Sequence, residues 1–93
     1  MKPVHYDSGE VDPLDLIAAA GYNVLEGFCR GNVIKYCFRY KEKGGAKDLN
    51  KALFYLELLR QLENYRCFAM MATGKPPVKV PPLRELKEKY GRS

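Results

Sequence analysis

Apolar and polar residues recur along this chain with the spacing of helices, and glycines and prolines separate the periodic segments. The first segment opens at Asp12-Pro13, where the aspartate can accept bonds from first-turn amides and the proline suits the first helical position, and it ends at Gly21. The pattern then predicts a helix from about Val24 to Lys43, another from about Ala46 to Met71, and a short last helix from Leu83 to Tyr90. We therefore expect an all-α fold.

The breaks between these segments predict how the helices are connected. Gly44-Gly45 leaves only a short turn between the second and third helices, so the two should form an antiparallel hairpin. After Gly74, the run KPPVKVPP cannot continue a helix and predicts an extended spacer of polyproline type. We expect a helical core over residues 1–73, a Pro-rich linker over residues 74–82, and a C-terminal docking helix with a basic tail over residues 83–93.

The last helix needs a surface to pack against. Leu83, Leu86 and Tyr90 form an apolar stripe that so short a helix cannot bury alone, so it must dock on its own chain or on another copy. The pattern leaves both arrangements open. Because a chain of 93 residues buries only a modest core, we expect a homo-oligomer.

The second helix is expected to be divided lengthwise into two unlike faces. At about 100° per residue, side chains that can bind an anion fall on one face and apolar side chains cover the other. The polar face holds Asn32, Lys35, Tyr36, Arg39 and Lys43, and the apolar face holds Val33, Ile34, Cys37 and Phe38.

The first turns of the third helix repeat this arrangement. Asp48, Lys51, Ala52 and Tyr55 share one face, since spacings of three and four residues place side chains on the same side of a helix. In an antiparallel hairpin this face lies beside the polar face of the second helix. We therefore expect the cations and the two tyrosines to surround one crevice.

An apolar arc adjoins the polar face of the third helix. It consists of Leu49, Leu53 and Leu56, which we expect to be buried. On that expectation, Leu53→Ala would cost roughly 2–5 kcal/mol of stability.

Cations, an amide and two phenols around one crevice are typical of a small anion-binding site. Arginine donates paired bonds to phosphate, lysine adds a mobile charge, and a tyrosine ring can stack on a base. Asp48 would hold a neighbouring cation in position or accept a bond from a ribose hydroxyl. A solvated, salt-bridged surface has the same pattern, and such tyrosines are often core aromatics, so periodicity alone leaves the function open.

Charge and composition narrow the range of partners. The net charge of +5 favours anionic partners such as nucleotides, nucleic acid or an acidic protein surface. No run approaches the roughly 18 apolar residues of a membrane span, and MKPVHYDSGEVD lacks the apolar stretch of a signal peptide, so we expect a cytoplasmic protein with no membrane partner. Three cysteines without C-x-x-C spacing argue against a disulfide framework or a metal site, and we expect reduced, mostly buried thiols.

Several short motifs in the first two thirds of the chain form a recognisable order. They are His5-Tyr6, Glu10-Val11-Asp12, Leu16-Ile17, Gly31-Asn32-x-Ile34-Lys35-Tyr36-x-x-Arg39, Lys43-Gly44-Gly45 and Asp48-Leu49-x-Lys51-Ala52-x-x-Tyr55-Leu56. Together they resemble the pattern of a widespread bacteriophage family that was catalogued as of unknown function. That family includes a phage nucleotide kinase without the usual phosphate-binding loop.

The resemblance implies a set of ligand- and phosphate-binding residues. These are His5, Tyr6, Asn32, Lys35, Tyr36, Arg39, Lys43, Asp48, Lys51 and Tyr55. His5 is the addition to the residues found by helix geometry: its imidazole would bind phosphate, move a proton or serve as a structural hydrogen-bonding group.

The sequence favours binding without turnover. It contains no G-x-x-x-x-G-K-[ST] motif, and its carboxylates have no evident metal-binding spacing. We expect no catalytic residues, metal or cofactor, and a phage protein that sequesters a nucleotide immune signal made by its host, as an anti-defence sponge. The alternative is a phage nucleoside monophosphate kinase, which would need ATP and Mg²⁺, and a third interpretation is a nucleic-acid-binding protein.

Overall fold

The computed structural model describes residues 12–91, and its first helix begins where the sequence predicts. Helix α1 spans Pro13–Ala19, and the Leu14 N–H donates to Asp12 Oδ1 at 2.9 Å, which satisfies one of the unpaired amides of the first turn. Gly21 follows with a φ of 123°, a conformation that glycine adopts without steric cost. The glycine lets the chain turn sharply into the next helix.

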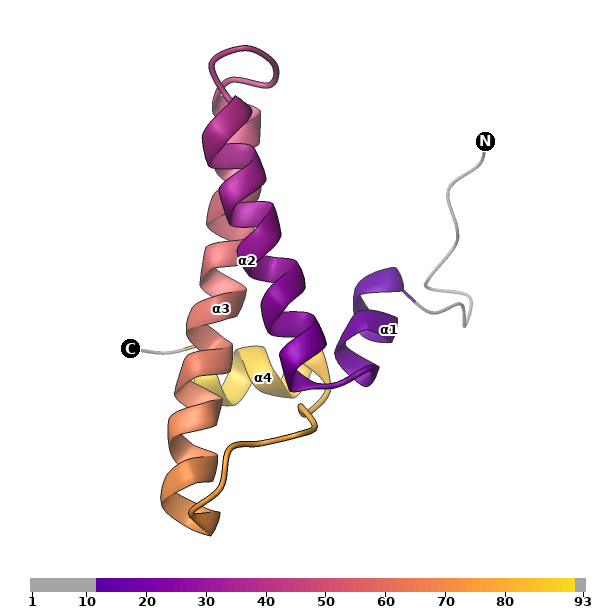
Figure 1. Ribbon diagram of the computed structural model, residues 1–93, viewed down its shortest axis with the longest axis vertical. Helices are drawn as coiled ribbons and strands as arrows, with labels where there is room; N and C mark the ends of the chain where they lie inside the picture. The colour runs from indigo at the N-terminus through magenta and orange to yellow at the C-terminus, as the bar shows by residue number, and fades with distance from the viewer. Residues whose placement is uncertain (1–11, 92–93) are drawn as a thin grey trace.

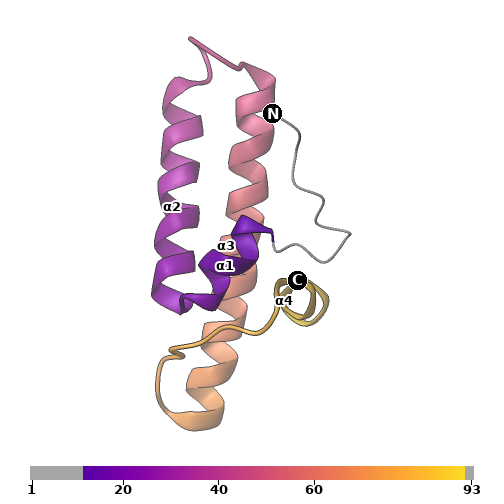
Figure 2. The same ribbon diagram turned by 90° about the vertical axis from the view of Figure 1, so that its right-hand side faces the viewer.

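Helices α2 (Tyr22–Arg39) and α3 (Ala46–Thr73) form the predicted antiparallel hairpin and lie side by side in both ribbon views (Figures 1 and 2). Helix α2 ends earlier than predicted, so Lys43 lies in the turn of residues 40–45 and not on the helix. The turn tightens there because the Gly45 N–H donates to the Tyr40 carbonyl at 2.7 Å. Gly74, with a φ of 74°, ends α3 as predicted.

The proline-rich linker returns along the lower part of the hairpin. The Tyr22 N–H donates to the Val78 carbonyl at 2.8 Å, and the Tyr65 hydroxyl donates to the Lys79 carbonyl at 3.2 Å. Helix α4 then spans Leu83–Tyr90, as the sequence predicts. Within residues 12–91 the structure contains four helices and no strand, so the all-α prediction is confirmed.

Helix α4 docks on α3 of the same chain. The Leu86 side chain is fully buried, and the Asn64 amide donates to the Tyr90 carbonyl at 2.9 Å. The Arg60 guanidinium also donates to the Gly91 carbonyl, which holds the end of the helix. Of the two arrangements that the sequence left open, the structure has docking within one chain.

The hydrophobic core lies in the lower half of the molecule, where all four helices meet (Figure 1). Its buried members are Ala18, Tyr22, Leu25, Cys29, Leu58, Leu62 and Leu86. In the upper half, only α2 and α3 pack together among the described helices. A pair of helices buries one seam between them, and the outer sides of both remain at the surface.

The apolar residues of the upper hairpin are therefore not buried as predicted. On α2, Ile34, Cys37 and Phe38 are exposed and Val33 is half-buried; on α3, Leu49, Leu53 and Leu56 are exposed. Leu53 is 61% exposed, so the predicted stability cost of Leu53→Ala is wrong for this chain and belongs to a buried leucine such as Leu62. The residues that line the seam between the two helices belong instead to the predicted polar faces: Arg39 contacts Asp48, and Tyr36 stacks near Tyr55.

Two further expectations concern cysteines and membranes. All three cysteines are free, but only Cys29 is buried, so the expectation of mostly buried thiols is wrong for Cys37 and Cys67. Burial raises the pKa of the Cys29 thiol to about 11. No helix within residues 12–91 has the length and apolar character needed to cross a bilayer.

Candidate functional site

An ion pair closes the upper end of the hairpin. Arg39, on the last turn of α2, donates from Nε to Asp48 Oδ2 at 3.3 Å and from Nη2 to Oδ1 at 3.4 Å. The Gly44 N–H donates to the same carboxylate at 2.9 Å. Asp48 is only 1% exposed, so these donors replace the water that an aspartate normally binds.

The surroundings of Asp48 decide its protonation. Burial opposes its ionisation, but the bonds from Arg39 and from the Gly44 amide outweigh burial and hold the pKa of the carboxyl below its ordinary value. Glycine is also favoured sterically at position 44, since a Cβ atom there would collide with the Asp48 carboxylate. The sequence motif Lys43-Gly44-Gly45 is thus explained in part by the fold: the carboxylate occupies the space of a missing side chain.

Three cations gather around the ring of Tyr36. The Lys35 Nζ lies 4.8 Å from the ring centroid, the Arg39 Cζ 4.9 Å and the Lys51 Nζ 5.3 Å. Two of these residues come from α2 and the third comes from α3, so the hairpin brings together side chains that are distant in sequence. We call the surface formed by Lys35, Tyr36, Arg39, Lys51 and Tyr55 the basic face.

Aromatic rings extend the basic face toward the core. Tyr36 and Tyr55 lie nearly parallel, with centroids 6.3 Å apart and an interplanar angle of 6°. Phe28 and Phe54 each meet Tyr55 edge-on, at 5.7 Å and 5.1 Å. Burial, and then the neighbouring Tyr36, raise the pKa of the Tyr55 phenol, which keeps it protonated.

Phe28 and Phe54 were missed by the sequence reasoning. Phe28 lies one turn before Asn32, and the same helical spacing that groups the polar residues also places it on their side of α2. For Phe54 the sequence holds no comparable signal, because its contact with Tyr55 depends on the side-chain directions within α3.

The other predicted site residues join the basic face less directly. The Asn32 amide donates to the Phe28 carbonyl of its own helix at 2.9 Å, which leaves its oxygen as the group able to bind elsewhere. Lys43 is exposed in the turn above the face. His5 and Tyr6 lie outside the described residues; α1, which they precede in the sequence, packs on the same side of the hairpin (Figure 2).

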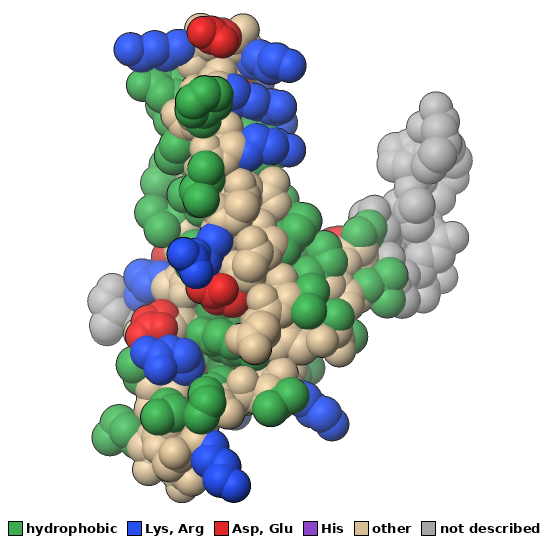
Figure 3. All heavy atoms as spheres, viewed as in Figure 1, with side chains coloured by type: hydrophobic (Ala, Val, Ile, Leu, Met, Phe, Trp, Pro, Cys, Tyr) green, Lys and Arg blue, Asp and Glu red, His purple; other side chains and the backbone are tan. Residues whose placement is uncertain are grey.

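The basic face is an open surface and not the enclosed crevice that the sequence predicts. Lys35 and Lys51 are exposed, and Tyr36, Arg39 and Tyr55 are half-buried. Figure 3 shows basic side chains along the right-hand edge of the upper hairpin and apolar side chains across its front and left-hand side. The two helices lie close enough at the turn for Arg39 to reach Asp48 across the seam.

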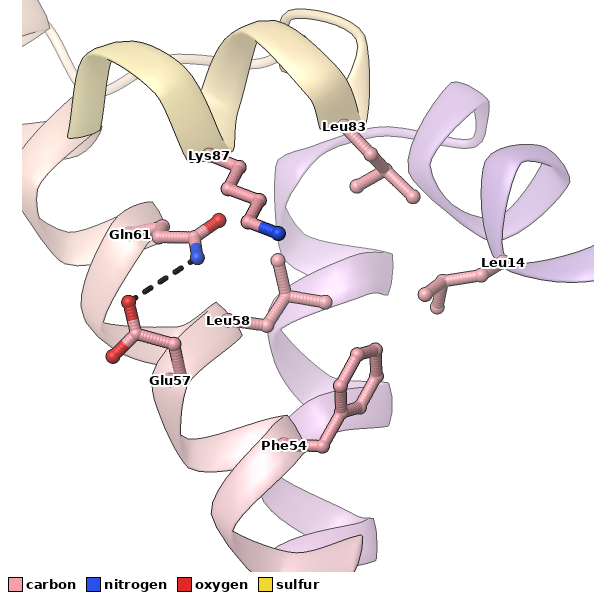
Figure 4. Close-up of a pocket in the computed structure, with 7 residues that line it drawn as sticks. All are labelled: Leu14, Phe54, Glu57, Leu58, Gln61, Leu83 and Lys87. Atoms are coloured by element: carbon pink, nitrogen blue, oxygen red, sulfur yellow. Dashed lines mark hydrogen bonds between the residues drawn. The ribbon is translucent and has the colours of Figure 1, made fainter. Parts of the chain in front are cut away.

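A separate hollow of about 220 Å³ lies between α1, α3 and α4 (Figure 4). Its walls are mainly apolar and are formed by Leu14, Phe54, Leu58 and Leu83, together with Glu57, Gln61 and Lys87. The Lys87 side chain points inward, toward Leu58 (Figure 4). The Gln61 amide donates to Glu57 at 3.3 Å, which engages two of these polar groups with each other. None of the ten predicted site residues lines this hollow, and its apolar walls do not suit a phosphate.

A metal centre finds no support among residues 12–91, where no three histidine, cysteine, aspartate or glutamate side chains come together as a possible metal-binding group.

Comparison with known proteins gives one match. Residues 1–57, which contain α1, α2 and the first turns of α3, match the family described as a protein of unknown function, DUF3310. The matched segment includes all ten predicted site residues, from His5 to Tyr55, and so spans the whole basic face. No curated protein and no solved structure matches the chain.

Proposed function

The chain belongs to the DUF3310 family, and from the geometry of its basic face we propose that it binds a phosphorylated nucleotide there without chemical turnover. The observation that carries this proposal is the convergence of three cations, at 4.8, 4.9 and 5.3 Å, on the single ring of Tyr36.

Such an arrangement concentrates positive charge. Lys35, Arg39 and Lys51 contribute three charges, and Asp48 neutralises one of them, which leaves an excess of two positive charges beside the ring. Like charges held close together repel each other, and a bound anion offsets this repulsion, so anion binding lowers the electrostatic free energy of the surface. A phosphate group fits this excess because lysine and arginine both donate to its oxygens.

The phenol rings supply the second half of a nucleotide site. Tyr36 and Tyr55 lie in nearly parallel planes beside the cations, and both are half-buried, so their positions are held by packing. A base stacked on an aromatic side chain contributes about 1–3 kcal/mol. A ligand with phosphate at one end and a planar base at the other therefore matches the face better than free phosphate does.

Binding is favoured over phosphoryl transfer by the state of Asp48. A kinase uses carboxylates to hold Mg²⁺ between its substrates. Asp48 is the one carboxylate among the predicted site residues, and it is buried and already bonded to Arg39 and to the Gly44 amide. Capture without turnover is the chemistry that a phage protein needs in order to sequester a nucleotide signal of host immunity, and this role is part of the proposal.

The test is calorimetric titration of the full chain with mononucleotides, nucleoside triphosphates and cyclic di- and trinucleotides. Lys51→Ala should weaken the binding of the best ligand by roughly 10- to 100-fold, the range for a charge-assisted hydrogen bond. Lys75→Ala is the matched control: it removes the same charge from an exposed residue after α3, and it should leave the affinity unchanged.

Four outcomes would count against the proposal. Absence of binding to every nucleotide removes it, and an equal loss in Lys51→Ala and Lys75→Ala would show attraction by net charge alone. Transfer of phosphate from ATP to a nucleoside monophosphate in the presence of Mg²⁺ would replace it with the kinase alternative. Retention of a DNA or RNA fragment that weakens with salt, with no nucleotide binding, would favour a nucleic-acid-binding protein.

A further inference from the structure

The side of the hairpin opposite the basic face is apolar. Because Lys35, Arg39 and Lys51 project from one side of the seam between α2 and α3, helical geometry places other residues on the far side. These are Val33 and Cys37 from α2 and Leu49, Leu53 and Leu56 from α3, with Ile34 and Phe38 continuing around the outer edge of α2. We call these seven residues the apolar face.

The apolar face is too large to be a scatter of single exposed residues. Ile34 and Phe38 are 66% and 89% exposed, and the three leucines are between 37% and 61% exposed. With roughly 150–250 Å² for a large side chain, these five alone present about 600 Å² of apolar surface. Isolated apolar patches of this size mark interaction sites, and a standard protein interface buries about 800 Å² of each partner.

Charge selects the kind of partner. The chain carries a net charge of +5, so two copies repel each other over most of their surfaces. On the apolar side, two of the basic neighbours are paired within the chain: Arg30 pairs with Glu26 at 3.5 Å, and Arg60 pairs with Glu57 at 2.7 Å. An acidic partner would be drawn to the opposite, basic face, whereas a second copy meets apolar side chains and these paired charges here.

The upper hairpin buries few apolar side chains, and this also favours a second copy as the partner. Of the residues around the upper seam, Ala52 and Asp48 are buried, and the large apolar side chains are outside. A small chain that cannot bury its apolar residues within itself gains most by burying them against an equivalent surface. A two-fold contact meets this need because the same patch serves both partners.

We propose that the apolar face packs against the same face of a second copy of this chain, so that the basic faces of both copies turn outward. The resulting dimer presents two anion-binding surfaces on opposite sides. The sequence suggested a contact between copies through the C-terminal helix. The contact proposed here differs, because Leu86 of that helix is already buried within its own chain.

The test compares two leucines of equal exposure. Leu53 on the apolar face is 61% exposed and Leu16 on α1 is 60% exposed, so neither substitution by lysine disturbs the core. Sedimentation across the micromolar range should give the mass of two 10.6-kDa chains for the wild type and for Leu16→Lys, and the mass of one chain for Leu53→Lys. Circular dichroism checks that each variant keeps its helices.

Cys37 gives an independent measurement, because it is exposed in the single chain and lies on the apolar face. Its alkylation should be slow in the wild type and several-fold faster in Leu53→Lys. A monomeric wild type throughout the range overturns the proposal, and so does a folded Leu53→Lys variant that keeps the wild-type mass. Since nucleotide binding is measured on the opposite face, loss of this proposal leaves the proposed function standing, and the reverse also holds.

Discussion

Leu86→Ala is the sharpest test of how the small domain is held together. The Leu86 side chain is fully buried where α4 meets α3, so the substitution removes about three methylene-sized groups from the core. At roughly 0.8 kcal/mol for each group, the lost transfer energy is about 2.4 kcal/mol, and the remaining cavity raises the total to about 2–5 kcal/mol. A chain of 93 residues has a stability of about 5–14 kcal/mol, so the loss is a large part of the whole.

The assay is urea unfolding followed by circular dichroism, with the melting temperature as a second readout. A loss of at least about 2 kcal/mol should lower the melting temperature by at least about 8 °C for a domain of this size. Leu16→Ala is the control: because Leu16 is 60% exposed, its truncation should cost about 1 kcal/mol or less.

Leu86→Ala and Leu16→Ala are both made in the Leu53→Lys background, so that self-association through the apolar face does not contribute to the measured stability. In that background the unfolding midpoint of the parent should be independent of protein concentration, since α4 docks on its own chain. If Leu86→Ala costs no more than Leu16→Ala, the packing of α4 described above is wrong. If the midpoint rises with concentration, α4 docks on another copy.

Three further predictions concern the turn between α2 and α3. Arg39→Ala should lower the unfolding midpoint as well as nucleotide affinity, because it leaves the buried Asp48 without its cation. The double variant Arg39→Ala with Asp48→Ala should recover part of the stability. If Arg39→Ala alone keeps the full stability, the ion pair between Arg39 and Asp48 does not form as described. Gly44→Ala should destabilise the turn, because a Cβ there meets the Asp48 carboxylate, whereas Gly27→Ala should add up to about 1 kcal/mol of stability in urea unfolding, because no atom lies within 4 Å of its Cβ position. Acid should weaken the turn: the lowered pKa of Asp48 contributes stability that is present above the ordinary carboxyl pKa near 3.8 and is lost as the pH falls through the lower folded value, so NMR signals of the turn should broaden or shift there in the wild type and not in Asp48→Asn.

The basic face illustrates how far helical periodicity reaches. Spacings of three and four residues correctly group Lys35, Tyr36 and Arg39 on one side of α2, because the helix repeat is a local property. The same reasoning adds Lys51 and Tyr55 once a short turn makes the hairpin antiparallel. Periodicity does not predict the hydrogen bonds that Arg39 and the Gly44 amide donate to Asp48, since these depend on how closely the two helices approach at the turn.

The apolar leucines show where the reasoning fails. Leu53 and Leu62 are the same residue type on the same helix, yet Leu53 is exposed and Leu62 is buried. Nine residues place them on opposite sides of α3, and they also differ in height: four helices surround the lower half of the hairpin, whereas two form the upper half. The local sequence around a residue does not show how many other helices will surround it in the folded chain.

The sequence by itself determined helices α1 to α4 and most of their ends, with the end of α2 at Arg39 as an exception. Caps at Asp12, the glycines of the turn and Gly74, and the proline run before Leu83 act on bonds between residues a few positions apart, so their effects can be read in order along the chain. The tertiary structure decided which sides of α2 and α3 are buried, whereas the apolar stripe of α4 was evident from its sequence. The rotation of a helix about its own axis depends on contacts between distant segments, and in this chain those contacts place an ion pair and two phenols in the seam and turn the leucines of the upper hairpin outward.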